Sequence, residues 1–201
     1  MNYRYLSVGT CFYLCTMIAS IMQGQSTRVK SDTCFISGIV ETENKRPIKN
    51  VEVILTIPGQ VFPAITTTED GKYSFSIECS DLSATIRLSR NDFYKNGVST
   101  LDLLRMQKHL LGIDLFNSPF KLVAADANNS QNVSALDMVE LRKLILGIYT
   151  ELPSNKSWRF VSKDPGSFNG ESTFYILNTS HSNVDFIGVK IGDVNNTAKP
   201  D

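Results

Sequence analysis

The chain has 201 residues, and its 20 Lys and Arg are balanced by 20 Asp and Glu, so its formal net charge is zero. This length accommodates one domain or two small ones, and a hydrophobic fraction of 42% excludes a wholly disordered chain. A neutral chain lacks the basic excess that nucleic-acid binding requires, so no nucleic-acid partner is expected. The two histidines leave little scope for His-based acid–base or zinc chemistry.

The N-terminal segment has the order of a secretory signal peptide. Arg4 precedes an uncharged, largely apolar run over residues 6–22, and small and polar residues follow it. A short membrane-spanning helix is the alternative, but Ser, Thr and Gly dilute the run and no basic cluster follows directly. We therefore expect a cleaved signal over residues 1–24, a protein that is secreted or held at the cell surface or in the periplasm, and no membrane span after cleavage.

Signal cleavage would leave Cys34 and Cys79 as the cysteines of the exported chain. Two cysteines in an exported protein are candidates for a disulfide. A bridge between them closes a loop of about 45 residues, which stabilises the fold by roughly 4 kcal/mol in the chain-entropy model. Two buried thiols are the alternative.

Between Cys34 and Arg90 the hydrophobic pattern has a period of two. The alternating runs are FISGIVET, VEVILTI, TTTEDGKYSFSIE and ATIRLS. Asp70 and Gly71 stand between two such runs, which predicts a β-hairpin at this point. Short strands at this spacing predict a small antiparallel β-sandwich over residues 32–90.

The same region resembles the carboxypeptidase-regulatory-like, transthyretin-type β-sandwich modules of exported bacterial proteins. The resemblance lies in SGIVETENKRPIKNVEVIL and TTTEDGKYSF, at Gly38, Pro47, Val51, Val53, Thr68, Gly71, Tyr73 and Phe75. It implies a fold with a turn glycine, a loop proline and inward-facing apolar residues. It implies no reaction.

Two later windows are copies of each other. VSTLDLLRMQKHLLGI at 98–113 and VSALDMVELRKLILGI at 133–148 agree at half of their positions, which indicates an internal duplication. Apolar residues at helical spacing and a closing glycine, Gly112 or Gly147, predict one short helix in each copy. The two helices are expected to pack together, because neither is stable alone.

The tail returns to strand-like runs, SWRFVS, STFYILN and DFIGVKIGDV. Such strands do not fold alone, so residues 151–201 are expected to pack on the preceding modules. The predicted class is α+β: a small antiparallel β-sandwich, then a two-helix module over residues 91–150, then further strands.

The segment before the second helix, DANNSQNVSALD, has the spacing of a twelve-residue calcium loop. Oxygen-bearing side chains stand at places 1, 3, 5, 9 and 12, and place 7 supplies a backbone carbonyl, which together suit a hard cation with 6–8 oxygen ligands. The residues in order are Asp126, Asn128, Ser130, Asn132, Ser134 and Asp137. The alternative is a capping box preceded by a plain turn, but capping does not require oxygens at places 1, 3 and 5. Gln131 replaces the usual glycine at place 6, which costs about 1 kcal/mol.

This doubled loop–helix unit, with Asp at place 12 and a Leu-rich helix that ends in Gly, resembles the dockerin module over residues 91–150. The resemblance implies calcium loops and docking into cohesin domains, as in extracellular polysaccharide-degrading complexes. In dockerins, places 10 and 11 and the nearby helix surface contact cohesin. The equivalent residues here are Thr100, Leu101, Lys108, Ala135, Leu136, Arg142 and Lys143. Leu101 and Leu136 also suit a core position.

The first copy departs from the calcium pattern, because Phe93 and Lys95 at places 3 and 5 are not ligands. Ser99 and Asp102 remain at places 9 and 12, and a lost site with only a capping box is one interpretation. The other is a split site, because Asp193 and Asn195 of IGDVNN have the spacing of places 1 and 3. The cofactor prediction is therefore one Ca²⁺ at residues 126–137 and a second at the split site.

No nucleophile elbow, zinc pair, P-loop or close carboxylate pair indicates catalysis, so an enzyme is not expected. The preferred interpretation is a secreted, non-catalytic, calcium-binding protein that assembles with an exported, cohesin-like partner. The alternative is a carbohydrate-binding accessory β-sandwich with a purely structural calcium module. In that case Phe62, Tyr94 or Trp158 would face a glycan.

Overall fold

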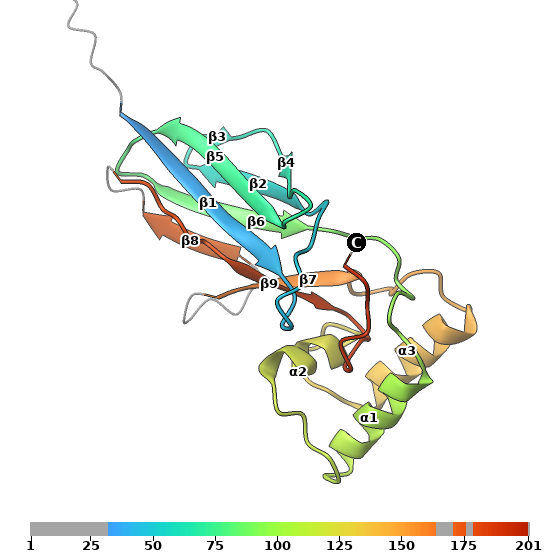
Figure 1. Cartoon of the computed structure of the whole chain (residues 1–201). Coiled ribbons are helices and arrows are strands. Elements are labelled where there is room, and N and C mark those ends of the chain that lie inside the picture. The colour runs from blue at the N-terminus through green and yellow to red at the C-terminus, as the bar shows by residue number, and fades with distance from the viewer. Residues whose placement is uncertain (1–31, 164–170, 176–178, 201) are drawn as a thin grey trace, which may run out of the picture. The chain divides into compact units, whose positions relative to one another are not determined.

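The computed structural model describes residues 32–163, 171–175 and 179–200, with the backbone alone for 171–175. The predicted signal peptide lies outside the described residues. Residues 32–201 group as one compact unit. The elements in chain order are β1 (Thr33–Glu41), β2 (Glu52–Ile57), β3 (Gln60–Val61), β4 (Ile65–Thr66), β5 (Lys72–Glu78), β6 (Ser83–Ser89), α1 (Thr100–Leu110), α2 (Pro119–Ala125), α3 (Ala135–Leu146), β7 (Trp158–Ser162), β8 (Glu171–Tyr175) and β9 (Phe186–Lys190) (Figure 1). The predicted α+β class is confirmed.

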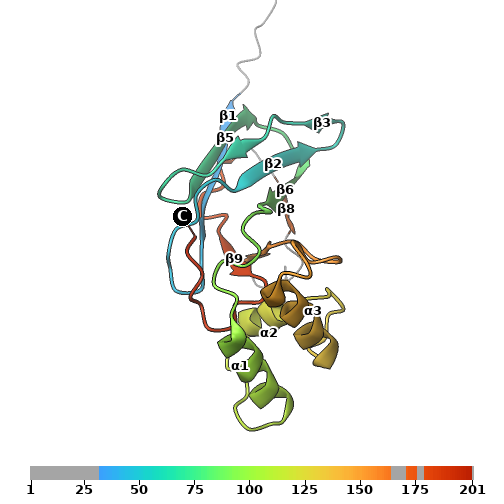
Figure 2. The same ribbon diagram turned by 90° about the vertical axis from the view of Figure 1, so that its right-hand side faces the viewer.

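Two sheets contain strands from both ends of the described chain. One sheet has the order β5-β1-β9-β7, and the other has β3-β2-β6-β8, with β4 paired to β2 (Figure 2). β9 pairs in parallel with β1, and β8 pairs antiparallel with β6. The later strands thus satisfy backbone groups that β1 and β6 would otherwise leave unpaired at a sheet edge. The helical region is inserted between the strands of one two-sheet structure.

The predicted two-residue alternation places the core between the sheets. In β5, Tyr73, Phe75 and Ile77 are buried, and the residues between them are exposed. They join a core that also contains Val53 and Leu55 of the other sheet. A disulfide joins Cys34 in β1 to Cys79, the residue after β5, and so links the ends of two paired strands.

The predicted hairpin at Asp70 and Gly71 is wrong, although the turn itself forms. Gly71 has a φ of +70°, but β4 before the turn pairs with β2, and β5 after it pairs with β1. The turn therefore carries the chain from one sheet to the other. The cause is Thr67, whose Oγ1 accepts from Val51 N at 3.0 Å and donates to Ile48 O at 2.8 Å. These buried bonds hold the incoming chain against the start of β2.

The helices of the duplicated segment are α1 and α3, and they pack against each other as predicted. Met106 of α1 and Leu141 and Leu144 of α3 are fully buried in a second core. The structure adds α2 between them; Ser118 caps this helix, and Pro119 is its first residue. The Ser-Pro pair is a helix-start signal that the sequence prediction missed. Within the described ranges, no helix has the length and apolar character needed to cross a bilayer.

Candidate metal centre

The predicted twelve-residue loop, residues 126–137, connects α2 to α3, and the helix ends position its two carboxylates. Asp126 is the C-cap residue of α2, and Asp137 lies in the first turn of α3. Both are buried, with exposed fractions of 3% and 0%. Asn129 and Gln131 have φ values of 58° and 67°. The loop therefore curls through left-handed positions even though place 6 is not a glycine.

The carboxylate of Asp126 organises the front of this loop. Its Oδ1 accepts from Ser130 N at 2.8 Å, and its Oδ2 accepts from Gln131 N at 2.9 Å. The hydroxyl of Ser130 donates to the carbonyl of Asn132 at 3.1 Å. Places 1, 5, 6 and 7 are thereby tied together.

The carboxylate of Asp137 organises the back of the loop. Its Oδ1 accepts from Asn128 N at 3.0 Å, and its Oδ2 accepts from Ser134 N at 2.8 Å. The second bond belongs to the predicted capping box. The first reaches across the loop, from place 12 to place 3, which capping alone does not require. Hydrogen bonds thus connect all six residues that the sequence predicts as calcium ligands.

Two residues near this loop were missed by the sequence prediction. Arg159 of β7 places Nη1 3.8 Å from Asp126 Oδ2, and Asn155 donates from Nδ2 to the Asp126 carbonyl at 2.8 Å. Both come from a later part of the chain, so no local pattern indicates them. Two buried carboxylates together with amide, hydroxyl and carbonyl oxygens are the donor set that suits Ca²⁺.

The front of the first copy is used for other contacts. Asn91 Oδ1 accepts from Ser157 N at 2.9 Å, and Phe93 is 72% exposed. At the back of this copy, Ser99 N and Oγ donate to Asp102 Oδ2 at 2.9 and 2.8 Å, the same capping box as in the second copy. The structure therefore keeps places 9 and 12 of this copy together, while the side chain of Asn91 bonds to Ser157.

The C-terminal segment, residues 193–198, lies against this incomplete copy. Val194 N donates to Asp102 Oδ1 at 3.1 Å, and Thr197 Oγ1 donates to Gly97 O at 3.1 Å. Asp102 and Asp193 are 0% and 4% exposed. Burial raises the pKa of Asp102, the hydrogen bonds from Ser99 oppose this rise, and the Asp193 carboxylate adds to it.

The predicted partner residues lie at the surface of the helices. Thr100, Leu101, Lys108, Ala135, Leu136 and Arg142 are exposed, and Lys143 is half-buried. Leu101 and Leu136 are 48% and 67% exposed, so neither belongs to the core. A groove of about 410 Å³ between α1 and α3 is lined by Leu104 and Leu146, among others, and both of these are also exposed. The two copies together present an apolar surface to solvent.

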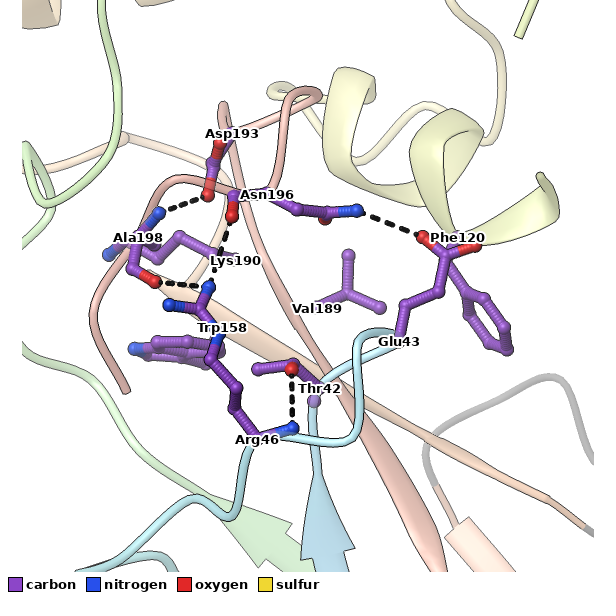
Figure 3. Close-up of a pocket in the computed structure, with 11 residues that line it drawn as sticks. Thr42, Glu43, Arg46, Phe120, Trp158, Val189, Lys190, Asp193, Asn196 and Ala198 are labelled. Atoms are coloured by element: carbon purple, nitrogen blue, oxygen red, sulfur yellow. Dashed lines mark hydrogen bonds between the residues drawn. The ribbon is translucent and has the colours of Figure 1, made fainter. Parts of the chain in front are cut away.

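The aromatic residue of greatest interest for glycan binding is buried. Trp158 is 2% exposed, and Arg90 and Lys190 each place a charged atom 5.5 Å from its ring centroid. Figure 3 shows Trp158 beside a small pocket whose other residues come from the β1–β2 loop, α2, β9 and the C-terminal segment. A glycan therefore has no access to the face of this ring.

Comparison with known proteins gives one assignment, and it covers the helical region. Neither curated proteins nor solved structures gave a match to the chain. Residues 92–151 match the family model described as the dockerin type I domain. This range contains both copies of the duplicated segment and the three helices that the structure describes. Over this range, which excludes both sheets, the chain is therefore similar to the dockerin type I domain.

Proposed function

We propose that this protein is an exported, non-catalytic assembly protein whose dockerin domain binds one Ca²⁺ at residues 126–137 and docks onto a cohesin-type domain of another exported protein. The observation that carries this proposal is the bonded group of oxygen donors around Asp126 and Asp137, beside an exposed apolar helix surface. The disulfide between Cys34 and Cys79 fits an exported protein.

The charge of the loop supports the calcium proposal. Asp126 and Asp137 supply two negative charges at positions that are 3% and 0% exposed, and burying carboxylates costs free energy unless a cation offsets it. The neighbouring Arg159 compensates in part, from one side of the loop. With Ca²⁺ bound, both carboxylates would be balanced, and the start of α3 would be fixed relative to α2.

The apolar surface of α1 and α3 supports the partner proposal. Leu101 and Leu136 occupy equivalent places in the two copies, and both are exposed. Leu104, Val139 and Leu146 add exposed apolar area on the same two helices. A contiguous exposed apolar surface with polar neighbours marks a protein–protein interaction site. Its proximity to the loop would make docking depend on calcium.

Binding to immobilised cohesin domains from exported proteins of the source organism tests the partner proposal. Leu136→Arg should weaken binding about 30-fold or more, the loss expected of a hot-spot residue worth about 2 kcal/mol. Val61→Arg is the matched control, because Val61 has the same exposed fraction of 67% but lies on β3. Chelation of calcium should also abolish binding. Equal binding by both variants, or by the chelated protein, contradicts the proposal.

For the two-sheet region we propose the role of a scaffold of the carboxypeptidase-regulatory-like type. Its matching residues Val51, Val53, Tyr73 and Phe75 are buried, which supports a structural role for them. A glycan array checks the carbohydrate-binding alternative. Specific glycan binding that survives chelation would favour that alternative over the scaffold.

A further inference from the structure

We propose that the protein has a second calcium site, assembled from two segments that lie about ninety residues apart in the chain. The ligands are the side chains of Asp193, Asn195 and Thr197 in the C-terminal segment, then the Gly97 carbonyl and the side chains of Ser99 and Asp102. The proposal goes beyond the contiguous loop, and it adds Thr197 and the Gly97 carbonyl to the residues indicated by the sequence.

The front of the split site repeats the hydrogen bonds of the contiguous loop. Asp193 Oδ1 accepts from Thr197 N, at place 5, at 3.0 Å, and the corresponding bond of the contiguous loop is 2.8 Å. Asp193 Oδ2 accepts from Ala198 N, at place 6, at 2.6 Å, and the corresponding bond of the contiguous loop, from Gln131 N to Asp126 Oδ2, is 2.9 Å long. The C-terminal segment therefore offers Asp193 the same two backbone donors that places 5 and 6 offer Asp126, although Ala198 lacks the positive φ of Gln131.

The back of the site repeats the contiguous loop as well. Thr197 Oγ1 donates to Gly97 O, and the equivalent bond joins places 5 and 7 of the contiguous loop; both are 3.1 Å long. Ser99 N donates to Asp102 Oδ2 at 2.9 Å, against 2.8 Å between the equivalent atoms. The chain break thus falls between place 6, which is Ala198, and place 7, which is Gly97.

Gly97 is where the two segments meet. A Cβ on this glycine would lie 2.5 Å from Ala198 N and 2.6 Å from Ala198 Cα, which is closer than real contacts allow. Its φ of +77° also favours glycine. The close approach of two backbones places the carbonyl at place 7 beside the front half of the site.

The amide of Asn195, at place 3, independently points to a ligand. Its Oδ1 is buried, and it has no hydrogen-bond partner among the residues that the structure describes. In the contiguous loop the equivalent oxygen, Asn128 Oδ1, accepts from Ser130 N at 3.0 Å. A buried acceptor without a partner costs free energy. A hard cation between Asp102 and Asp193 would satisfy this oxygen and would offset two buried carboxylates.

The site would hold the C-terminal segment onto the dockerin domain and the sheets together. Figure 3 shows Arg46, in the β1–β2 loop, reaching this segment: Nη2 donates to Asn196 O at 3.0 Å and to Ala198 O at 2.8 Å. Asp102, at the other side, lies in the first turn of α1. Calcium at this position would therefore link α1 to the sheets through residues 193–198.

Calorimetric titration of the purified protein with Ca²⁺ tests the proposal. The unsubstituted protein should bind two ions, Asp193→Asn one, Asp137→Asn one and the double variant none. Asp114→Asn, an exposed carboxylate outside both sites, is the matched control and should still bind two. Two ions bound by Asp193→Asn overturn the split site. If the unsubstituted protein binds no ion, both the split site and the contiguous site are overturned. If the unsubstituted protein and Asp137→Asn each bind one ion and Asp193→Asn binds none, only the contiguous site of the proposed function is contradicted.

Asn195→Ala provides a second measurement that does not depend on Asp193. Because the amide oxygen is buried and has no partner without an ion, this variant should melt at or above the unsubstituted temperature in chelator. In calcium, its affinity at one site should fall about tenfold or more, a loss that even outer-shell changes can produce at metal sites. Unchanged affinity at both sites overturns the proposal even if Asp193→Asn fails to fold.

Discussion

The guanidinium of Arg159 lies 3.8 Å from the carboxylate of Asp126, at the first place of the contiguous loop. Arg159 belongs to β7, in the sheet region, and Asp126 follows α2. A cation entering the loop would meet this positive charge, so the ion pair opposes binding by electrostatic repulsion while it compensates the buried carboxylate. If residues 126–137 bind calcium as proposed, the sheet region would therefore influence the affinity of that loop for the ion.

We predict that Arg159→Gln strengthens calcium binding at residues 126–137. Arg159 is partly exposed, with 30% of its side chain accessible, so solvent weakens its effect to about 1 kcal/mol, or roughly fivefold in affinity. Calorimetry measures the change, with Arg105→Gln on the exposed side of α1 as the control. Weaker binding by Arg159→Gln would show that Arg159 instead positions the loop for the ion.

Chelation should lower the melting temperature. A ligand that binds only the folded state at a hundredfold excess over Kd stabilises it by about 2.7 kcal/mol, which corresponds to roughly 5–10 °C for a unit of this size. Asp137→Asn should reduce the shift, and the Asp137→Asn, Asp193→Asn double variant should abolish it. Differential scanning calorimetry with and without chelator measures these shifts. A double variant that retains the full shift would place the stabilising ion elsewhere.

Gly97→Ala and Gly112→Ala form a matched pair. Both glycines have positive φ, +77° and +70°, but a Cβ on Gly97 would strike Ala198, whereas one on Gly112 would meet nothing within 4 Å. Gly112→Ala should therefore cost only the conformational strain, about 1 kcal/mol. Gly97→Ala should cost more and should remove one of the two bound ions. Urea unfolding and calorimetric titration test both variants, and equal effects would contradict the close packing at Gly97.

Lys190 should give the protein an alkaline pH dependence. It is 4% exposed, and its Nζ donates to Phe93 O at 2.8 Å. Burial lowers its pKa from 10.5 to about 8, with Asp92 opposing the shift and Arg90 adding to it. Between pH 8 and 10.5 the unfolded chain holds this proton and the folded chain does not, so stability should increase with pH in that window.

The slope from this one group is at most about 1.4 kcal/mol per pH unit. Lys190→Met should remove it, and Lys108→Met, at an exposed position on α1, should not. Urea unfolding at several pH values between 7 and 10.5 measures the slope. Identical slopes in both variants would mean that Lys190 keeps an ordinary pKa in the folded protein.

Features that depend on neighbouring residues were predictable from the sequence. The periodicity of the two copies predicted α1 and α3, because a helix is formed by bonds between residues four apart. The alternation in β5 likewise predicted which of its side chains are buried. The spacing of residues 126–137 placed the oxygen donors in one loop for the same reason: the segment is contiguous, so local geometry brings its residues together.

Only the tertiary structure decided which separated segments meet. The strong turn signal at Asp70 and Gly71 was correct, yet Thr67 bonds redirected the preceding strand to β2. The exposure of Leu101 and Leu136 and the approach of Arg159 to Asp126 also depend on packing between elements. A residue pattern describes the groups that a segment offers. The pairing of β9 with β1 decides which distant segment meets the incomplete first copy. That pairing carries residues 193–198 to Gly97 and Asp102.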